Sequence, residues 1–303
     1  MPPPVILPAN SDGLARAAQL IAEGQPVAMP TETVYGLAAD ATNGAAVARI
    51  YAAKGRPSFN PLIVHVATQA AAERIGVFDA AARALAAAHW PGPLTLVVPL
   101  RADAGIAALV TAGLSTIALR VPAHPAMQAL LAATDKPLAA PSANASGKIS
   151  ATRAEHVLAS LGDRIALIVD GGPCERGIES TIVAATGGRL RLLRRGPIEV
   201  EAIEEARGIE APGQLESHYA PSKPLRLDAI TSRNDEFHIG FGTVAGDASI
   251  SSSGDPVEAA ARLFDLLHQA DASSAPSIAV APVPGDGLAA AIRDRLKRAA
   301  APR

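Results

Sequence analysis

The sequence is short of cysteine and of aromatic residues. Its 303 residues include a single cysteine, Cys174, and only 3% aromatic residues. One cysteine excludes an intrachain disulfide, and no group of cysteine and histidine residues has the spacing of a structural zinc site. The apolar fraction is nevertheless 49%, so aliphatic side chains must fill the interior. These features predict a folded protein of a reducing compartment.

An excess of charge of one sign is also missing, because 27 lysine and arginine residues face 29 aspartate and glutamate residues. Stable binding to a long nucleic acid usually needs a basic excess or a basic face, so we expect none, although a transient contact with RNA stays open. The N-terminal segment has no basic start followed by an apolar core, and no apolar run approaches the length of a membrane span. We therefore expect a cytoplasmic protein without a membrane segment.

Several familiar catalytic signatures are absent as well. The loop 141–150 is not a Walker A loop, because Ser142 replaces the required glycine and Ile149 follows Lys148. Residues 240–242 lack the third glycine of a dinucleotide fingerprint. No Gly-x-Ser-x-Gly elbow occurs, and no nucleophile with an adjacent base is evident. The sequence therefore favours catalysis by positioning and electrostatic stabilisation over covalent catalysis.

What the sequence does contain is an alternation of helix and strand patterns, long enough for about two domains. Asn43 can cap a helix that runs to Lys54, where Gly55 enforces a break. Thr152 and Glu155 have the spacing of a capping box that opens a helix. The main strands of this part are expected at residues 26–29, 62–66, 94–99, 116–121, 137–140 and 165–170, followed by a hairpin around Gly187-Gly188 and a closing helix from Pro197.

A change of composition follows this first part. Residues 208–224 carry glycine, proline and serine and are typical of a linker. Beyond them, strands are expected at residues 237–241 and 278–281, with helices that begin at Asp255 and span residues 287–300. The order β-α-β-α favours a second, small unit with a parallel sheet.

Cationic and hydroxyl-bearing residues gather at the ends of the predicted elements. Lys54 and Arg56 lie two residues apart in a chain that proline holds extended, so their side chains can converge on one anion. Arg120 and Arg194 each end a predicted strand, and the loop 141–150 offers hydroxyl and N–H groups that can cradle phosphates. Each cation alone is also explained as a solvated surface charge or a helix-end charge. Together they favour a site for small, multiply charged anions.

Two further polar positions allow two interpretations each. The turn that contains Thr31, Glu32 and Thr33 suits local turn capping as well as ligand binding. His65 lies within the expected apolar strand at residues 62–66, where a lone histidine is commonly a core residue, but its nearness to the cationic loop favours a role in the site about equally.

These segments together resemble the long, two-domain form of the threonylcarbamoyl-AMP synthase family. The resemblance is carried, in the family's order, by PTETVYGL, KGRPSFNPLIVHV, WPGPLTLVV, ALRVPAHP, PLAAPSANASGKIS, ESTIV and LLRRGPI between residues 30 and 198. SHYAPSKPL at residues 217–225 and the ending DGLAAAIRDRLKRAA resemble the long form. Any one of these motifs is weak, whereas their order is specific.

The resemblance implies an α/β catalytic domain at residues 1–207, a twisted open mixed sheet with surrounding helices and a large cationic cavity. It implies a linker or lid at residues 208–225 and a small parallel α/β, Rossmann-like domain at residues 226–303. The implied enzyme is a nucleotidyltransferase that converts L-threonine, bicarbonate and ATP, with Mg²⁺, into threonylcarbamoyl-AMP and pyrophosphate. A separate transferase complex then passes the threonylcarbamoyl group to adenosine in tRNA.

The resemblance also assigns site residues. Lys54 and Arg56 are the implied catalytic residues, facing bicarbonate or phosphate oxygens. L-Threonine is assigned to Thr33, His65, Arg120, Ala140 and Ser180. ATP is assigned to Arg56, Asn60, Thr116, Ser142, Asn144, Ser150, Arg194 and Tyr219, with Tyr219 closing over the ligands. Arg195 follows Arg194 where the family more often has proline, so both arginines are candidates for the nucleotide contact, and the metal ligands are unassigned.

Two other functions compete with this interpretation. One is an RNA-binding module without adenylating activity, which the end of the pathway on tRNA favours and the balanced charge opposes. The other is a different carbamoyl-adenylating enzyme, as in hydrogenase maturation. That enzyme would be expected to bring zinc-finger and acyl-phosphatase modules, for which the sequence has no signature.

Overall fold

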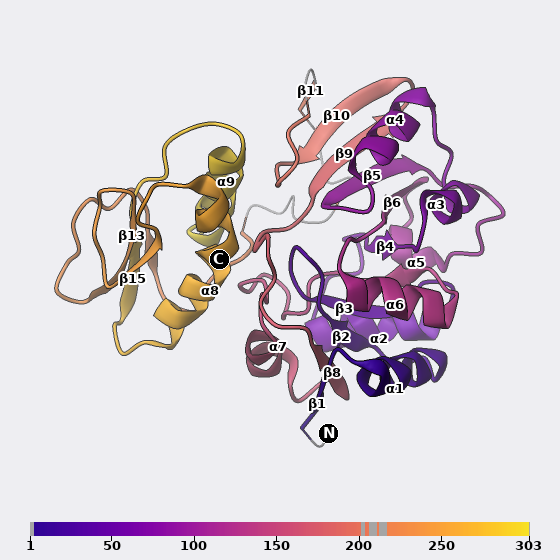
Figure 1. Ribbon diagram of the computed structural model, residues 1–303, viewed down its shortest axis with the longest axis horizontal. Helices are drawn as coiled ribbons and strands as arrows, with labels where there is room; N and C mark the ends of the chain where they lie inside the picture. Colours follow the sequence, from indigo (N-terminus) through magenta and orange to yellow (C-terminus); the bar gives the residue numbers. More distant parts are fainter. Residues whose placement is uncertain (1–2, 201–203, 206–210, 212–216, 303) are drawn as a thin grey trace.

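The computed structural model describes residues 3–200, 204–205, 211 and 217–302. In this part the chain forms a large N-terminal α/β unit and a small C-terminal α/β unit, which lie side by side (Figure 1). The predicted boundary at residue 207 and most of the predicted linker lie outside the described residues, so the domain limits stay predictions. No described helix is long and apolar enough to cross a membrane.

The large unit is built on one mixed sheet of eleven strands in the order β1-β8-β2-β3-β7-β4-β6-β5-β9-β10-β11. Its strands are β1 (Val5–Pro8), β2 (Val27–Met29), β3 (Gly36–Asp40), β4 (Ile63–His65), β5 (Leu94–Pro99), β6 (Thr116–Arg120), β7 (Leu138–Ala139), β8 (Leu167–Asp170), β9 (Thr181–Thr186), β10 (Arg189–Arg194) and β11 (Glu204–Glu205). The sheet contains parallel pairs, such as β4 with β6, and antiparallel pairs, such as β5 with β6. The predicted mixed sheet is confirmed.

Helices cover both faces of this sheet. They are α1 (Ser11–Ala22), α2 (Gly44–Lys54), α3 (Gln69–Ile75), α4 (Ala80–His89), α5 (Ala108–Thr111), α6 (Pro125–Thr134) and α7 (Ala154–Leu161). Successive strand residues point to opposite faces. In β2, Val27 and Met29 accordingly join the core beneath α1 and α6, whereas Ala28 joins the core beneath α2 and α7.

The small unit has a four-stranded parallel sheet in the order β12-β15-β13-β14, as the β-α-β-α pattern predicted. Its elements are β12 (Leu225–Arg226), β13 (Glu236–Phe241), β14 (Ala248–Ser251), α8 (Pro256–Ala272), β15 (Ser277–Val280) and α9 (Leu288–Ala299). The two helices lie between the small sheet and the large unit (Figure 1). Their side chains therefore form both the core of the small unit and its contact with the large unit.

Apolar and polar groups hold the two units together. Val34, Ile149 and Ile178 of the large unit join the core of the small unit beside α8 and α9. On the same interface the imidazole rings of His156 and His268 stack with their centroids 3.9 Å apart. The small unit thus packs directly behind the loop that contains Ile149.

The predicted capping box at Thr152 is wrong. Helix α7 begins at Ala154, and its N-cap, Arg153, makes no side-chain capping bond to any described residue. The backbone N–H of Thr152 lies 3.3 Å from Nδ1 of His156 instead, and the Thr152 hydroxyl lies 3.4 Å from the same atom. His156, in the first turn of α7, is therefore the partner of Thr152, and the expected reciprocal pair of Thr152 with Glu155 does not form.

The predicted helix from Pro197 is also wrong over the residues that the structure describes, because residues 197–200 have no helical assignment. Ile198 is tied to β9 instead. Its N–H donates to Thr181 Oγ1 at 2.9 Å, and its carbonyl oxygen accepts from the same hydroxyl at 2.8 Å. This two-way contact keeps the chain beside the sheet after β10.

Candidate active site

A closed cavity lies where several strand ends of the large unit meet the segment 217–220. It is lined by Thr31, Thr33, Val34, Gly36, Arg56, Ile63, His65, Arg120, Ala140, Pro141, Ser142, Glu179, Arg194, His218 and Tyr219. Strand pairing explains part of this set, because β4 and β6 are parallel neighbours and place His65 directly opposite Arg120. Residues far apart in the sequence thus share one wall.

Lys54, at the C-terminus of α2, lies behind the cavity lining and contacts it through Ser142. Gly55 ends that helix with a left-handed φ of 59°, as its position after Lys54 predicted. The Lys54 Nζ donates to the carbonyl oxygens of Ser142 at 2.6 Å and Asn144 at 2.5 Å. Burial, together with the positive charge of Arg56, lowers the pKa of Lys54 well below its ordinary value. This ammonium group therefore gains stability from any anion that enters.

Arg56 reaches the cavity through a turn that its own guanidinium holds. Its Nε donates to the carbonyl oxygen of Asn60 at 3.2 Å, and its Nη2 donates to that of Pro61 at 3.0 Å. Burial lowers the pKa of Arg56 to about 10, which leaves the side chain charged at neutral pH. Hydrogen bonds thus hold the side chains of Lys54 and Arg56 on one side of the same cavity.

Two asparagine side chains near these cations have buried polar atoms that the described residues leave unpaired. They are both polar atoms of the Asn60 side chain and Oδ1 of Asn144. The Nδ2 of Asn144 does have partners, the carbonyl oxygens of Ala145 and Lys148, each at 2.9 Å. A buried polar group without a partner is costly. These atoms are therefore candidates for contacts to a ligand.

Arg120 organises the opposite end of the cavity. Its Nη1 donates to Thr33 Oγ1 at 2.9 Å, its Nη2 to Glu32 Oε1 at 2.5 Å and its Nε to the carbonyl oxygen of Gly92 at 3.1 Å. Burial opposes ionisation of Glu32, but the Arg120 charge holds the pKa of that carboxyl below its usual value. The side chains of Arg120 and Glu32 are only 4% and 8% exposed. Arg120 therefore orients the Thr33 hydroxyl from a fixed position.

His65 is a buried, neutral histidine beside Arg120. Burial and the neighbouring guanidinium lower the pKa of His65 to about 3. Its Nδ1 has no partner among the described residues. Both interpretations of the sequence hold in part, since His65 is a core residue of β4 that also lines the cavity.

Arg194 reaches the cavity from the end of β10. Its Nε donates to the carbonyl oxygen of Ser180 at 3.0 Å, and its Nη2 lies 3.0 Å from Ser180 Oγ. The next residue, Arg195, is exposed, while Arg194 is only 7% exposed. A side chain at Gly196 would collide with the backbone of β9, because an added Cβ would lie 2.4 Å from the Thr181 nitrogen. Of the two candidate arginines, Arg194 therefore lines the cavity.

The segment 217–220 covers the cavity and is bonded on both sides. The N–H of Ala220 donates to the carbonyl oxygen of Gly147 at 2.8 Å, and the N–H of His218 donates to that of Arg298 at 3.2 Å. Tyr219 between them has a left-handed φ of 64° and is 1% exposed. Its hydroxyl has no partner among the described residues. A strained, buried tyrosine thus fills the mouth of the cavity.

The volume of the cavity shows that this arrangement is closed. The space measures about 50 Å³, whereas ligand pockets commonly measure 300–1,000 Å³. A water molecule occupies about 30 Å³ of liquid, so the hollow has room for one or two. The space is therefore too small for a typical small-molecule ligand in the arrangement in which the segment 217–220 lines it.

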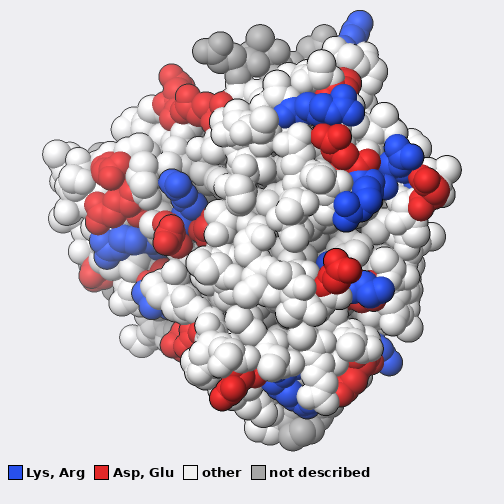
Figure 2. All heavy atoms as spheres, turned by 45° about the vertical axis from the view of Figure 1, so that its right-hand side comes forward, with Lys and Arg blue, Asp and Glu red and all other residues white. Residues whose placement is uncertain are grey.

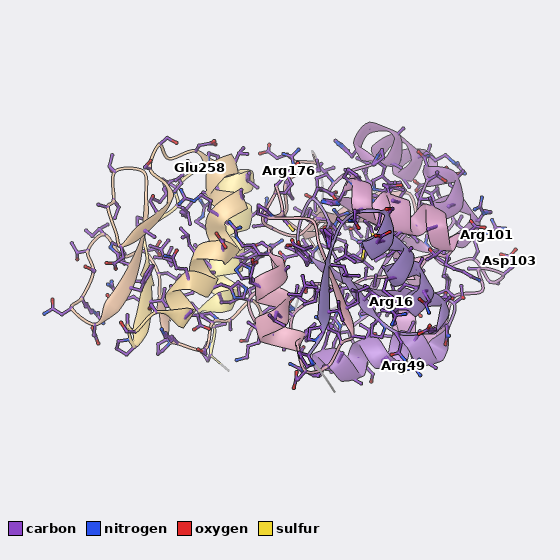
Figure 3. All side chains as sticks on the ribbon, turned by 60° about the horizontal axis from the view of Figure 1, so that its bottom comes forward. Arg16, Arg49, Arg101, Asp103, Arg176 and Glu258 are labelled. Atoms are coloured by element: carbon purple, nitrogen blue, oxygen red, sulfur yellow. The ribbon has the colours of Figure 1, made fainter. Side chains whose placement is uncertain are left out.

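A larger hollow lies elsewhere on the large unit but has none of these features. It measures about 610 Å³ and contains Arg101 and Asp103, which Figure 3 shows at the outer edge of the large unit. The two side chains pair with each other at 3.2 Å and are 44% and 76% exposed. Exposed, mutually paired charges bind ligands weakly. Size alone therefore does not make this hollow the candidate site.

The structure brings most of the predicted site residues together. The cavity lining includes Thr33, Arg56, His65, Arg120, Ala140, Ser142, Arg194 and Tyr219. Lys54, Ser150 and Ser180 contact that lining through Ser142, Glu179 and Arg194. Thr116 starts β6 opposite Pro99, four residues before Arg120, and is not in the lining that the structure describes. The role of each residue stays a prediction.

Three polar lining residues were not assigned to the site: Thr31, Glu179 and His218. Thr31 lies in the motif PTETVYGL and Glu179 in the motif ESTIV. Their membership of these motifs was the sequence signal that could have assigned them to the site. Behind Glu179 lies Arg295 of α9, whose Nε donates to Glu179 Oε2 at 2.8 Å. No sequence pattern connects these two residues.

A metal ion would find few ligands here. The described residues contain no group of three or more histidine, cysteine, aspartate or glutamate side chains that could hold one. Glu179, the carboxylate in the described lining, already pairs with Arg295, and Glu32, which is outside that lining, pairs with the lining residue Arg120. The residues around the cavity are therefore suited to anions.

The fold and the cavity define a two-unit α/β protein whose cavity is lined by buried arginines and covered by the segment 217–220. A family profile described as telomere recombination matches residues 19–196, and a profile described as the C-terminal domain of threonylcarbamoyl-AMP synthase matches residues 190–301. The chain belongs to the two-domain Sua5 family of threonylcarbamoyl-AMP synthases.

Individual relatives agree with this membership along the whole chain. Threonylcarbamoyl-AMP synthase of Bacillus subtilis (strain 168) is 40% identical over 97% of this chain and 94% of its own length. The enzyme of Pyrococcus abyssi is 38% identical over 93% of this chain and 92% of its own length. The crystal structure of Pyrococcus abyssi Sua5 complexed with L-threonine superimposes with a TM-score of 0.90 at 34% identity, covering 98% of this chain and 97% of that one.

Proposed function

We propose that this chain is a nucleotidyltransferase that makes threonylcarbamoyl-AMP from L-threonine, bicarbonate and ATP and releases pyrophosphate. The observation that carries the proposal is the shared hollow of Arg56, Arg120 and Arg194, with Lys54 behind it. ATP and bicarbonate are anions and threonine carries a carboxylate, so the three reactants need such a concentration of positive charge in order to approach one another. The names of the relatives and the threonine-bound structure of Pyrococcus abyssi Sua5 support the same reaction.

L-Threonine is assigned to the end of the cavity organised by Arg120. Arg120 can attract the carboxylate, while Thr33 and His65 offer a hydroxyl and a neutral imidazole at fixed positions. A neutral His65 leaves the amino group of threonine free of a competing positive charge. Ala140 and Ser180 border the same space.

ATP is assigned to the end formed by Arg56, Asn60, Asn144 and Arg194. The unpaired buried atoms of the two asparagines supply hydrogen-bond partners for a ligand, and the arginines supply charge for phosphate oxygens. Ser142 lines the cavity, and Ser150 contacts the lining through its hydrogen bond to Glu179. Mg²⁺ would arrive with the triphosphate as part of the substrate, since the cavity's carboxylates are already paired.

The reaction then needs positioning rather than a protein nucleophile. The unprotonated amine of threonine attacks the carbon of CO₂ with release of a proton, or the carbon of bicarbonate with loss of water. The carbamate that forms attacks the α-phosphorus with an oxygen atom. The bond between the α-phosphorus and the bridging oxygen breaks, and pyrophosphate leaves. Lys54 and Arg56 stabilise the negative charge of this in-line transfer.

The partners and the location complete the proposal. A tRNA threonylcarbamoyl transferase complex would receive the product through transient contacts in the cytoplasm. The face of the chain in Figure 2 carries basic and acidic residues interspersed, without a continuous basic area. Such a surface supports weak and brief contact with RNA rather than stable binding.

The decisive experiment measures pyrophosphate and AMP formation while threonine and bicarbonate are omitted in turn. We expect product only when both are present, with the adenylate detected by mass spectrometry. Pyrophosphate release that is indifferent to threonine would reject the substrate assignment. Tight, steeply salt-dependent binding of tRNA without ATP cleavage would favour an RNA-binding module, and turnover of carbamoyl phosphate would favour the other carbamoyl-adenylating enzyme.

A further inference from the structure

The C-terminal unit inserts one arginine into the wall of the substrate cavity. Arg295 lies on α9 and has no exposed surface, which is rare for arginine unless the side chain is paired. Its Nε donates to Glu179 Oε2 at 2.8 Å, and its Nη2 donates to the carbonyl oxygen of Arg195 at 2.8 Å. Both acceptors belong to the large unit. An arginine of one unit therefore completes its hydrogen bonds on the other.

Glu179 brings negative charge to a cavity that otherwise gathers positive charge. It lines the cavity together with Arg56 and Arg194 and is 5% exposed. Burial would raise the pKa of Glu179, but the charges of Arg295 and Arg194 and the hydrogen bond from Ser150 hold it below its ordinary value. The carboxylate is therefore ionised at neutral pH. Without compensation, it would repel the phosphates that a nearby arginine attracts.

We infer that Arg295 is a positioning residue for adenylation, because it cancels the charge of Glu179 and so lets the cavity accept ATP. The inference rests on the proposed function. By holding Oε2, Arg295 leaves Oε1 to accept the Ser150 hydroxyl at 2.5 Å. The Arg295 guanidinium also lies 5.2 Å from the ring centroid of Tyr219, so the same side chain contacts the residue that fills the cavity mouth. The small unit thereby becomes part of the nucleotide site.

The two partners of this ion pair depend on each other unequally. Arg295 also pairs with Asp294, at 2.8 Å, and keeps that acidic partner if Glu179 is replaced. Glu179 pairs with no basic group other than Arg295 within 4.0 Å in the part of the chain that the structure describes. Without Arg295 it would keep the hydrogen bond from Ser150 and only the more distant charge of Arg194. Loss of Arg295 should therefore be worse than loss of Glu179. Removing Glu179 as well should relieve the loss of Arg295, because the charge to be cancelled is then gone.

The test compares R295Q, E179Q and the double variant E179Q/R295Q with the intact protein. It measures the KM values for ATP and threonine in threonine-dependent pyrophosphate release, and the Kd of a nonhydrolysable ATP analogue by calorimetry. We expect R295Q to raise the KM for ATP and the Kd at least tenfold, while the KM for threonine stays within threefold. The double variant should bind the analogue at least threefold more tightly than R295Q.

Arg293 supplies a matched control on the same helix. Its Nη1 donates to the carbonyl oxygen of Val283 at 2.7 Å, inside the small unit. R293Q removes an arginine from α9 without touching the cavity. It should therefore keep the KM for ATP of the unaltered protein.

Three results would overturn the inference: binding of the analogue by R295Q within threefold of wild type, equal rises in both KM values, or a double variant no better than R295Q. If R295Q fails to fold, the double variant decides, because it should fold and bind the analogue within fivefold of wild type. Tenfold weaker binding by the double variant would then count against the inference. A wild-type protein that releases pyrophosphate without threonine refutes the proposed function instead, and the analogue measurements still judge Arg295.

Discussion

Two buried arginine–glutamate pairs border the same cavity, but they connect different parts of the molecule. The pair of Arg120 and Glu32 lies wholly within the large unit, at 2.5 Å. The pair of Arg295 and Glu179 joins the two units, at 2.8 Å. The first pair needs residues of the large unit alone, whereas the second also needs α9 of the small unit. The comparison teaches that the proposed threonine end belongs to one unit and the proposed nucleotide end to both.

The largest effect is expected from breaking the pair within the large unit. R120M leaves Glu32 buried without its charged partner, which should lower the free energy of unfolding by about 3–5 kcal/mol and abolish threonine-dependent turnover. Urea unfolding and the pyrophosphate assay measure the two effects. The exposed pair of Arg101 and Asp103 provides the control, because R101Q should change the free energy of unfolding by less than about 1 kcal/mol. An R120M protein as stable as R101Q would show that the buried pair is not structural.

The next effect concerns the segment between the units. Y219A removes the buried ring that contacts His218 and Phe264 at centroid distances of 4.1 and 5.6 Å. We expect kcat to fall by about 100-fold, equivalent to about 2.7 kcal/mol, because the cavity no longer closes. Y219F should retain kcat within threefold, since the hydroxyl has no partner among the described residues. Equal losses of kcat in Y219A and Y219F would show that the hydroxyl, rather than the ring, is required.

A smaller effect should appear as a pH dependence of the contact between the units. Burial, then the charge of His156 stacked on it, lowers the pKa of His268 to about 4, despite the opposing hydrogen bond to Ser150 and the carboxylates of Asp265 and Asp271. The folded protein thus prefers neutral His268, so this contribution to stability is present above the unfolded pKa near 6.5. It is lost as the pH falls from about 6.5 toward 4.

H268Q tests that dependence, because glutamine does not titrate. Between pH 7.5 and pH 4.5 the wild-type free energy of unfolding should fall by about 2 kcal/mol more than that of H268Q. Urea unfolding at both pH values gives the difference, and subtraction cancels the contributions of His65 and His218, whose pKa values burial also lowers. Equal losses of unfolding free energy in the wild type and in H268Q would show that His268 does not cause the pH dependence of the contact between the units.

The smallest effect is expected from the partly exposed ion pair between the units. Arg153 donates to Asp265 at 2.8 Å, with side chains 43% and 34% exposed. R153Q should cost at most about 1 kcal/mol at low salt and less at high salt, because solvent and salt screen exposed charges. Unfolding at two ionic strengths measures this change. If R153Q lowered the free energy of unfolding as much as R120M, the partly exposed pair would contribute as much to stability as the buried pair, contrary to this prediction.

Local signals in the sequence were sufficient for much of the fold. The Asn43 cap is confirmed, with bonds from the N–H groups of Ala45 and Ala46, and so is the hairpin around Gly187-Gly188. By contrast, β3 was not predicted. It reads GLAAD, without a β-branched or aromatic residue, and is a strand because β2 and β7 pair with it. Its pairing partners lie elsewhere in the sequence.

The same distinction applies to the site. Arg120 and Arg194 could be predicted to meet because both end strands of one sheet, and the structure places both in the cavity lining. Arg295 could not be predicted, because its partner Glu179 lies 116 residues earlier and in the other unit. A helix pattern reveals which face of α9 is apolar. It does not reveal which residue of the large unit that face will meet.

The closed cavity has a consequence for the stability of whatever is made inside it. An acyl-adenylate is a mixed anhydride, which water cleaves. The cavity of about 50 Å³ is too small for such a product, so the segment 217–220 would have to shift to hold one. With Tyr219 of that segment still covering it, the product would be shielded from bulk solvent. Its lifetime would then be set by how often the hydrogen bonds of Ala220 and His218 to the two units break. The segment that admits the substrates would also control when the labile product is released.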